Sequence, residues 1–246
     1  MYEKRKHLLK IVAIYILAAL VITFLLIYYS EDQRVKANND NKENQVTVKP
    51  ETFKQEYRNS KGEVRLILSY QYPNLSGEYK GIDKANCRYT TLFSNWLKEQ
   101  DEIIDSVSEE ENTGGSKYGN EVSYTITFNR NNIFSVLFEG YLFTGGAHGM
   151  PYRTPTNIDL RGGDEVDLTK LMNKSKEQIK KQVNDAFKKK IDQDKSLYWD
   201  NAYTIVEQTK FEDLRYYFTE NGIVFYFDPY VLAPYAAGFV EATISY

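Results

Sequence analysis

The stretch from Ile11 to Tyr29 contains no charged residue, and it divides the chain into parts with different surroundings. An α-helix over this stretch would be roughly 28 Å long at about 1.5 Å per residue, enough to cross the hydrocarbon core of a membrane. The preceding residues 1–10 are basic, and basic segments stay on the cytoplasmic side. We therefore expect a short cytoplasmic segment at residues 1–10, a single transmembrane anchor at residues 11–29 and an extracellular C-terminal domain at the cell membrane.

A cleavable signal peptide is the alternative to an anchor. The apolar region of a signal peptide spans about 7–15 residues and leads into a cleavage site with small residues. The apolar run is longer here, and the nearest such site, Val35-Lys36-Ala37, follows a charged stretch. The sequence therefore favours an uncleaved anchor, and it leaves open whether Val35-Lys36-Ala37 is cleaved.

Residues 30–50 are charged and rich in Asn, with few large apolar side chains. Such a segment cannot bury enough apolar surface to order itself, so we expect a flexible linker. The folded part of the chain is expected to begin near Glu51.

Hydrophobic periodicity predicts the secondary structure of the folded part. Alternating apolar and polar residues predict strands over Val64–Tyr72 and Val122–Phe128. The turn at Asn131-Asn132 predicts that Ile133–Phe143 returns beside the second of them as a hairpin. Apolar residues at three- and four-residue steps predict one helix from about Asp83 to Glu109 and another from about Ser175 to Ile191. Further strands are expected at residues 156–160, 215–219, 223–227 and 239–245. This order predicts an α+β fold in which mixed, mainly antiparallel sheets pack with two main helices.

Charge and cysteine content exclude some classes of partner and of stabilisation. The chain has 31 Lys and Arg against 34 Asp and Glu, and four of the basic residues lie in the first ten positions. A nucleic-acid-binding domain needs a basic surface, so we expect no nucleic-acid partner. Cys87 is the single cysteine, so no disulfide can form within the chain. The domain must therefore rely on its apolar core.

Histidine content argues against many kinds of enzyme. His148 is the single histidine after the apolar stretch, which excludes a zinc site built on two or three histidines of one chain. A Gly-x-Ser-x-Gly elbow, a phosphate-binding Walker loop and a dinucleotide-binding glycine pattern are also absent from the sequence. We therefore expect no catalytic residue, no metal ligand and no cofactor, and the sequence favours a binding protein over an enzyme.

Two segments stand out as candidates for contact with a ligand or partner. One is the glycine-rich turn at residues 144–149, and the other is a proline- and tyrosine-containing loop at residues 228–235. Tyrosine offers a large, fairly rigid contact surface with a polar tip and is common at binding hot spots. The candidate residues are Gly145, Gly146, His148, Pro229, Tyr230, Pro234 and Tyr235. The alternatives are a tight turn whose imidazole caps neighbouring carbonyls, and a loop folded onto the sheet with tyrosine hydroxyls bonded to backbone.

Three longer motifs carry a resemblance to a known family, namely residues 141–149, 157–168 and 222–238. Together they resemble the RsiV-like and PdaC-type extracytoplasmic domain pair, which occurs in a lysozyme-receptor anti-sigma factor. The pair also occurs beside the catalytic domain of some polysaccharide deacetylases and in uncharacterised membrane-anchored proteins of Gram-positive bacteria. The resemblance implies a non-catalytic α+β binding module with two subdomains, near residues 51–150 and 151–246.

The resemblance and the residues lead to one main functional expectation. We expect a membrane-anchored binding or sensor protein that faces the cell wall and recognises lysozyme, another extracellular protein, or peptidoglycan. Such anti-sigma factors hold a sigma factor with a cytoplasmic segment, and because only residues 1–10 precede the expected anchor, we do not expect this chain to sequester a sigma factor. The alternatives are a peptidoglycan-modifying enzyme or its accessory, such as a deacetylase-associated module, and a structural envelope protein without a dedicated ligand.

Overall fold

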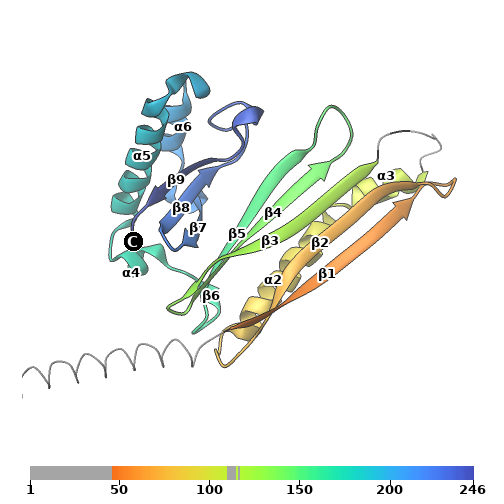
Figure 1. Cartoon of the computed structure of the whole chain (residues 1–246), viewed down its shortest axis with the longest axis horizontal. Coiled ribbons are helices and arrows are strands. Elements are labelled where there is room, and N and C mark those ends of the chain that lie inside the picture. Colours follow the sequence, from red (N-terminus) through yellow and green to blue (C-terminus); the bar gives the residue numbers. More distant parts are fainter. Residues whose placement is uncertain (1–45, 110–114, 116) are drawn as a thin grey trace, which may run out of the picture. The chain divides into compact units, whose positions relative to one another are not determined.

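The computed structural model describes residues 46–109, 115 and 117–246, which are coloured in Figure 1. The expected cytoplasmic segment, anchor and Val35-Lys36-Ala37 site, together with most of the expected linker, lie outside these residues. Within the described part, no helix combines the length and the apolar character needed to cross a membrane. Residues Val46–Tyr246 form one compact unit.

The first half of this unit is a six-stranded sheet with the strands in sequence order. Its strands are β1 (Thr47–Arg58), β2 (Val64–Ser76), β3 (Tyr118–Arg130), β4 (Ile133–Phe143), β5 (Met150–Asp159) and β6 (Asp164–Glu165). Neighbouring strands are antiparallel except β2 and β3, which are parallel. Parallel neighbours need a crossover connection, and α2 (Ile82–Lys98) and α3 (Asp101–Glu109) provide it. Figure 1 shows α2 lying along this sheet.

The second half is a three-stranded antiparallel sheet with a helix packed against it. Its strands are β7 (Arg215–Thr219), β8 (Gly222–Phe227) and β9 (Val240–Ile244). The main helix is α5 (Lys176–Gln193), and the shorter helices are α4 (Leu168–Met172) and α6 (Ala202–Gln208). The buried residues of α5 are the apolar stripe that its sequence predicts: Ile179, Val183, Phe187 and Ile191. The 3.6-residue period therefore predicts the helix and its buried face, and this face packs against β9.

The predicted α+β class with mainly antiparallel sheets is confirmed, with corrections to individual elements. The single helix expected from Asp83 to Glu109 is wrong, because Glu99 and Gln100 interrupt it and separate α2 from α3. Gln100 is buried at this interruption. The new helix, α3, begins with Asp101 and Glu102, whose negative charges stabilise a helix N-terminus. Asp83 does not cap α2, whose N-cap is Gly81.

β1 begins at Thr47, before Glu51, where the folded part was expected to start. The strand carries many charged residues and Pro50, so it lacks a regular apolar alternation. It lies at one edge of the six-stranded sheet, where charged side chains and proline discourage pairing with other chains. The division into subdomains at residues 51–150 and 151–246 stays a prediction, and β5 after residue 150 pairs with β4.

Two apolar cores fill the unit. The first packs aromatic residues of α2 against the six-stranded sheet, with Tyr70, Tyr89 and Phe138 fully buried. The second joins α5 to the three-stranded sheet around Phe187, Phe218 and Phe225, and it includes residues of β3 and β4. Both cores are built from residues of Val46–Tyr246, as expected of a part that folds by itself.

A buried polar cluster joins the two sheets. The Ser135 hydroxyl on β4 donates to Asn157 Oδ1 on β5 at 2.7 Å and accepts the backbone N–H of Phe218 on β7 at 3.1 Å. Asn157 Nδ2 in turn donates to the backbone carbonyl of Tyr216 on β7 at 2.9 Å. Ser135 and Asn157 are buried. Their side chains therefore provide hydrogen-bond partners for backbone groups on the outer edge of β7, where no neighbouring strand does so.

Candidate functional site

The turn at residues 144–149 and the loop at residues 228–235 meet on the surface of the unit. The rings of His148 and Tyr235 stack with centroids 4.1 Å apart, and the rings of Tyr230 and Tyr235 lie 5.6 Å apart. The Trp199 indole joins them through its bond to the carbonyl of Tyr230. We call Tyr141, His148, Trp199, Tyr230 and Tyr235 the aromatic cluster. It brings together two segments that sequence analysis could only single out separately.

The turn that carries His148 connects β4 to β5 and needs its glycines. Gly145 and Gly146 have φ values of 95° and 88°, in the left-handed region that favours glycine. At Gly149 a Cβ atom would meet the carbonyl oxygen of Leu142 at 2.6 Å and the ring of Tyr141 at 2.7 Å. The Gly149 N–H donates to the Tyr141 hydroxyl at 2.8 Å, so this side chain holds the end of the turn.

The loop that carries Tyr230 is held in a strained shape. Tyr230 has a φ of 69°, which costs a residue other than glycine roughly 1–3 kcal/mol. Trp199 supports this backbone, because its Nε1–H donates to the Tyr230 carbonyl at 3.1 Å. Its own backbone N–H donates to the carbonyl of the buried Leu232 at 2.9 Å. The result is a tyrosine side chain that remains 48% exposed on a fixed backbone.

Tyr235 and His148 also take part in the structural contacts that the alternative interpretation describes. The Tyr235 hydroxyl donates to the Gly149 carbonyl at 3.0 Å, and His148 Nδ1 lies 2.9 Å from the same oxygen. Desolvation and the neighbouring Tyr141 and Tyr230 raise the pKa of Tyr235, so its hydroxyl keeps its proton near neutral pH. These contacts fasten the turn to the loop, while Tyr230 has the more exposed ring.

The remaining predicted site residues differ in exposure. Pro229 is buried, and Pro234 and Gly146 are exposed. Two members of the cluster, Tyr141 and Trp199, are 44% and 41% exposed and were not among the predicted site residues. Trp199 lies in a stretch without clear periodicity, so only its contact with Tyr230 reveals its position in the site.

A salt-bridge network connects β4, β5 and β9. Arg153 on β5 donates to Glu139 at 2.8 Å and to Glu241 on β9 at 2.5 Å. Its guanidinium lies 4.1 Å from the ring centroid of Phe239, and the Tyr217 hydroxyl donates to Glu241 at 3.0 Å. The Arg153 side chain is only 15% exposed, so this network fixes β9 and the residue before it against β5.

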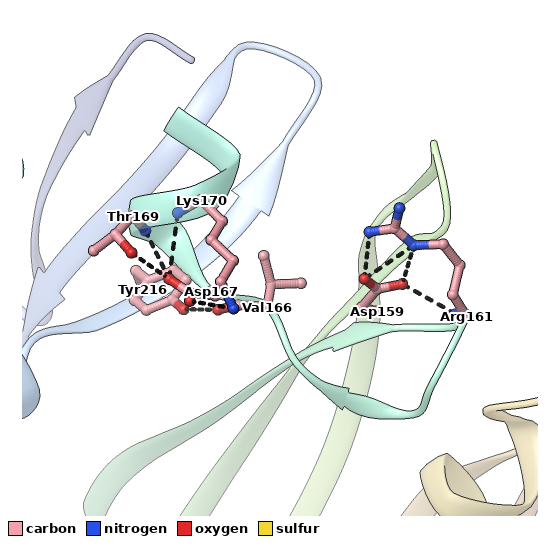
Figure 2. Close-up of polar contacts among 7 residues, drawn as sticks. All are labelled: Asp159, Arg161, Val166, Asp167, Thr169, Lys170 and Tyr216. Carbon is pink, nitrogen blue, oxygen red and sulfur yellow. Dashed lines mark hydrogen bonds and ion pairs between the residues drawn. The ribbon is translucent and has the colours of Figure 1, made fainter. Parts of the chain in front are cut away.

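A hollow of about 470 Å³ lies around the turn from β5 to α4 and is lined by several carboxylates. Figure 2 shows the Arg161 guanidinium beside Asp159 and the Asp167 carboxylate at the start of α4. Asp164 and Glu165 are also paired, with Lys84 and Arg88 of α2. These carboxylates therefore already have partners within the chain, and they hold the turn. No group of three His, Cys, Asp or Glu side chains in the described ranges is arranged to hold a metal ion.

Asp167 should make the stability of the fold depend on pH in the acidic range. Hydrogen bonds from Thr169 and Lys170 lower the pKa of Asp167 from 3.8 to about 2. Its carboxylate therefore stabilises the fold fully above about pH 4, and this stabilisation is lost as the pH falls toward about 2. Asparagine keeps the cap without the charge. We expect wild type to melt at a higher temperature than Asp167→Asn at pH 7, with the difference shrinking below pH 4. A difference that is the same at pH 7 and pH 2 would contradict this role.

Family models match two segments of the chain. Residues 59–151 match the family model described as Deacetylase PdaC, and residues 166–246 match the model described as Protein of unknown function (DUF3298). Tyr141 and His148 thus lie in the first match, and the other three members of the aromatic cluster lie in the second. No curated protein matches the chain.

Two crystal structures of DUF3298 family proteins share the fold. The one from Bacteroides fragilis is 18% identical, with a TM-score of 0.52 over 83% of this chain and 92% of its own. The one from Pseudomonas aeruginosa is 15% identical, with a TM-score of 0.51 over 81% of this chain and 91% of its own. The two family matches confirm the resemblance that the motifs predict, with a segment similar to the PdaC model followed by one similar to the DUF3298 model.

Proposed function

We propose that this chain is a non-catalytic binding or sensor protein, anchored in the membrane by residues 11–29, whose folded unit faces the cell wall. The aromatic cluster is its binding surface, and its partner is a protein such as lysozyme or a wall glycan. The observation that carries the proposal is the exposed ring of Tyr230 on a left-handed backbone that Trp199 holds in place.

Backbone strain and aromatic exposure both support a binding role. Strained residues persist where the surrounding structure over-determines them, and they gather at functional sites. Exposed tyrosine and tryptophan rings on a fixed scaffold bury much area on binding and lose little conformational entropy. A loop with only a structural role would gain nothing from leaving such rings in solvent.

The chemistry of the cluster favours contact over catalysis. Its titratable side chains are one imidazole and three phenols, and His148 Nδ1 faces the carbonyl of Gly149. Residues 140–152 and 229–240 contain no carboxylate, lysine, arginine or cysteine. A paired nucleophile and base, or two carboxylates flanking a bond, is therefore not built into these segments.

A peptidoglycan-modifying enzyme, or an accessory to one, is the second candidate, and the match to a model described as a deacetylase favours it. This candidate predicts turnover of peptidoglycan by the protein, lost when His148 is replaced by alanine. Binding without turnover, in wild type and in His148→Ala alike, supports the non-catalytic function instead.

The direct test uses a soluble fragment, residues 46–246, which contains both cores. Immobilised lysozyme and insoluble peptidoglycan are each incubated with the fragment, and the retained fraction is measured. We expect retention on at least one of the two. If both leave the fragment in solution at micromolar concentrations, the proposed function is wrong.

A further inference from the structure

We propose that the aromatic cluster takes an uncharged glycan, whose sugar rings lie on the exposed faces of Tyr230 and Trp199. This inference rests on the proposed function, because it uses the same surface. It goes further by choosing the chemical class of the ligand and by giving each side chain a role in holding it.

The absence of charge in both segments argues for an uncharged ligand. Charged residues make up 26% of the chain, yet residues 140–152 and 229–240, which carry Tyr141, His148, Tyr230 and Tyr235, contain none. Asp228 at the start of the loop is paired with Arg215, and Asp200 follows Trp199 in the sequence. Interfaces with charged partners place opposite charges against each other, because an unpaired charge loses hydration without compensation. A cationic protein surface would therefore find no carboxylate in these segments, whereas an uncharged sugar needs none.

The size of the exposed aromatic surface also favours a small ligand. A large aromatic side chain buries about 150–250 Å² when fully covered. With exposures of 44%, 41% and 48%, Tyr141, Trp199 and Tyr230 together offer roughly 200–350 Å². A stable protein interface buries about 800 Å² on each partner, so this surface alone is too small for one. It matches the faces of a few sugar rings.

The geometry prepares the cluster for stacking and for hydrogen bonds to hydroxyl groups. The face of an aromatic ring carries partial negative charge, which attracts the weakly positive C–H groups on one face of a pyranose. The Trp199 ring is held by its bond to the Tyr230 carbonyl, and the Tyr230 ring lies 5.6 Å from that of Tyr235, so both rings lose little freedom on binding. When His148 Nδ1 donates to the Gly149 carbonyl, Nε2 is an acceptor for a sugar hydroxyl.

Tryptophan fluorescence offers a readout that is sensitive to this surface. The chain has two tryptophans, and Trp96 is buried in the first core while Trp199 is 41% exposed. The fragment of residues 46–246 is titrated with chitotetraose and with cellotetraose, both uncharged. We expect a saturable change in emission with at least one of them, and a much weaker one with the cationic, fully deacetylated tetramer of glucosamine.

Two variants separate the site from the rest of the surface. Tyr230→Asn removes the ring but keeps a residue that tolerates the left-handed backbone, so the loop should still fold. It should weaken the affinity for the tetrasaccharide by about tenfold. Tyr246→Ala removes a tyrosine that is 51% exposed at the end of the chain, outside the cluster, and should leave the affinity unchanged. Calorimetry on Trp199→Leu gives a second test that does not depend on fluorescence, with the same loss expected.

The outcomes distinguish this inference from the proposed function. If neither uncharged tetrasaccharide binds while lysozyme or peptidoglycan still retains the fragment, the glycan assignment is wrong and the binding function stands. If Tyr230→Asn binds the tetrasaccharide as tightly as wild type, the site is misplaced. If nothing retains the fragment, both proposals fail.

Discussion

Replacing Phe187 with alanine lowers the free energy of unfolding by about 3–5 kcal/mol, the range for truncating a large buried aromatic residue. Phe187 is fully buried on the inner face of α5, and its ring meets that of Phe227 edge-on with centroids 4.9 Å apart. Its loss leaves a cavity between the helix and the three-stranded sheet. Urea denaturation of residues 46–246, followed by circular dichroism, measures the effect.

Lys189→Ala is the matched control on the same helix, because Lys189 is exposed. Alanine has the higher helix propensity, so this variant should unfold within about 0.5 kcal/mol of wild type. A loss below about 1 kcal/mol for Phe187→Ala would mean that α5 does not pack as described.

Replacing Ser135 with valine breaks the polar connection between the two sheets and destabilises the unit by about 2–4 kcal/mol. Valine replaces the hydroxyl by two methyl groups at a fully buried position, so it crowds the site and also leaves the Phe218 N–H and Asn157 Oδ1 buried without their partner. We expect the amide of Phe218 to exchange its hydrogen much faster in the variant, because the outer edge of β7 is no longer held.

Ser123→Val is the control for this change, since Ser123 is an exposed position on β3 where valine suits a strand. Its stability should stay within about 0.5 kcal/mol of wild type. If Ser135→Val is as stable as this control and Phe218 stays protected, the sheets are held together by other contacts.

Local patterns in the sequence predict the elements whose buried face repeats regularly. The stripe of α5 is confirmed because its apolar face is buried along the helix, and the β3–β4 hairpin is confirmed although β4 is buried on both faces from Ile133 to Phe138. The break at Gln100 was missed because apolar residues continue at helical spacing on both sides of it. β1 was missed because an edge strand with exposed charges has no such alternation.

The candidate site was predictable only as separate pieces. Composition singles out the glycine turn and the Pro-Tyr loop, but the stacking of His148 on Tyr235 depends on how β4, β5 and the second sheet dock. That docking rests on side chains such as Ser135 and Arg153, whose partners lie far away along the chain. Trp199 shows no periodic signal of its own, so only the folded structure places it beside Tyr230.

The central claim is that the aromatic cluster is the surface through which this protein binds its partner. The most direct test measures retention of residues 46–246 on peptidoglycan and on lysozyme for wild type, Tyr230→Asn and Tyr246→Ala, all checked for folding by circular dichroism. We predict that the material that retains wild type retains Tyr246→Ala equally and binds Tyr230→Asn about tenfold more weakly. Equal retention of all three proteins would contradict the claim.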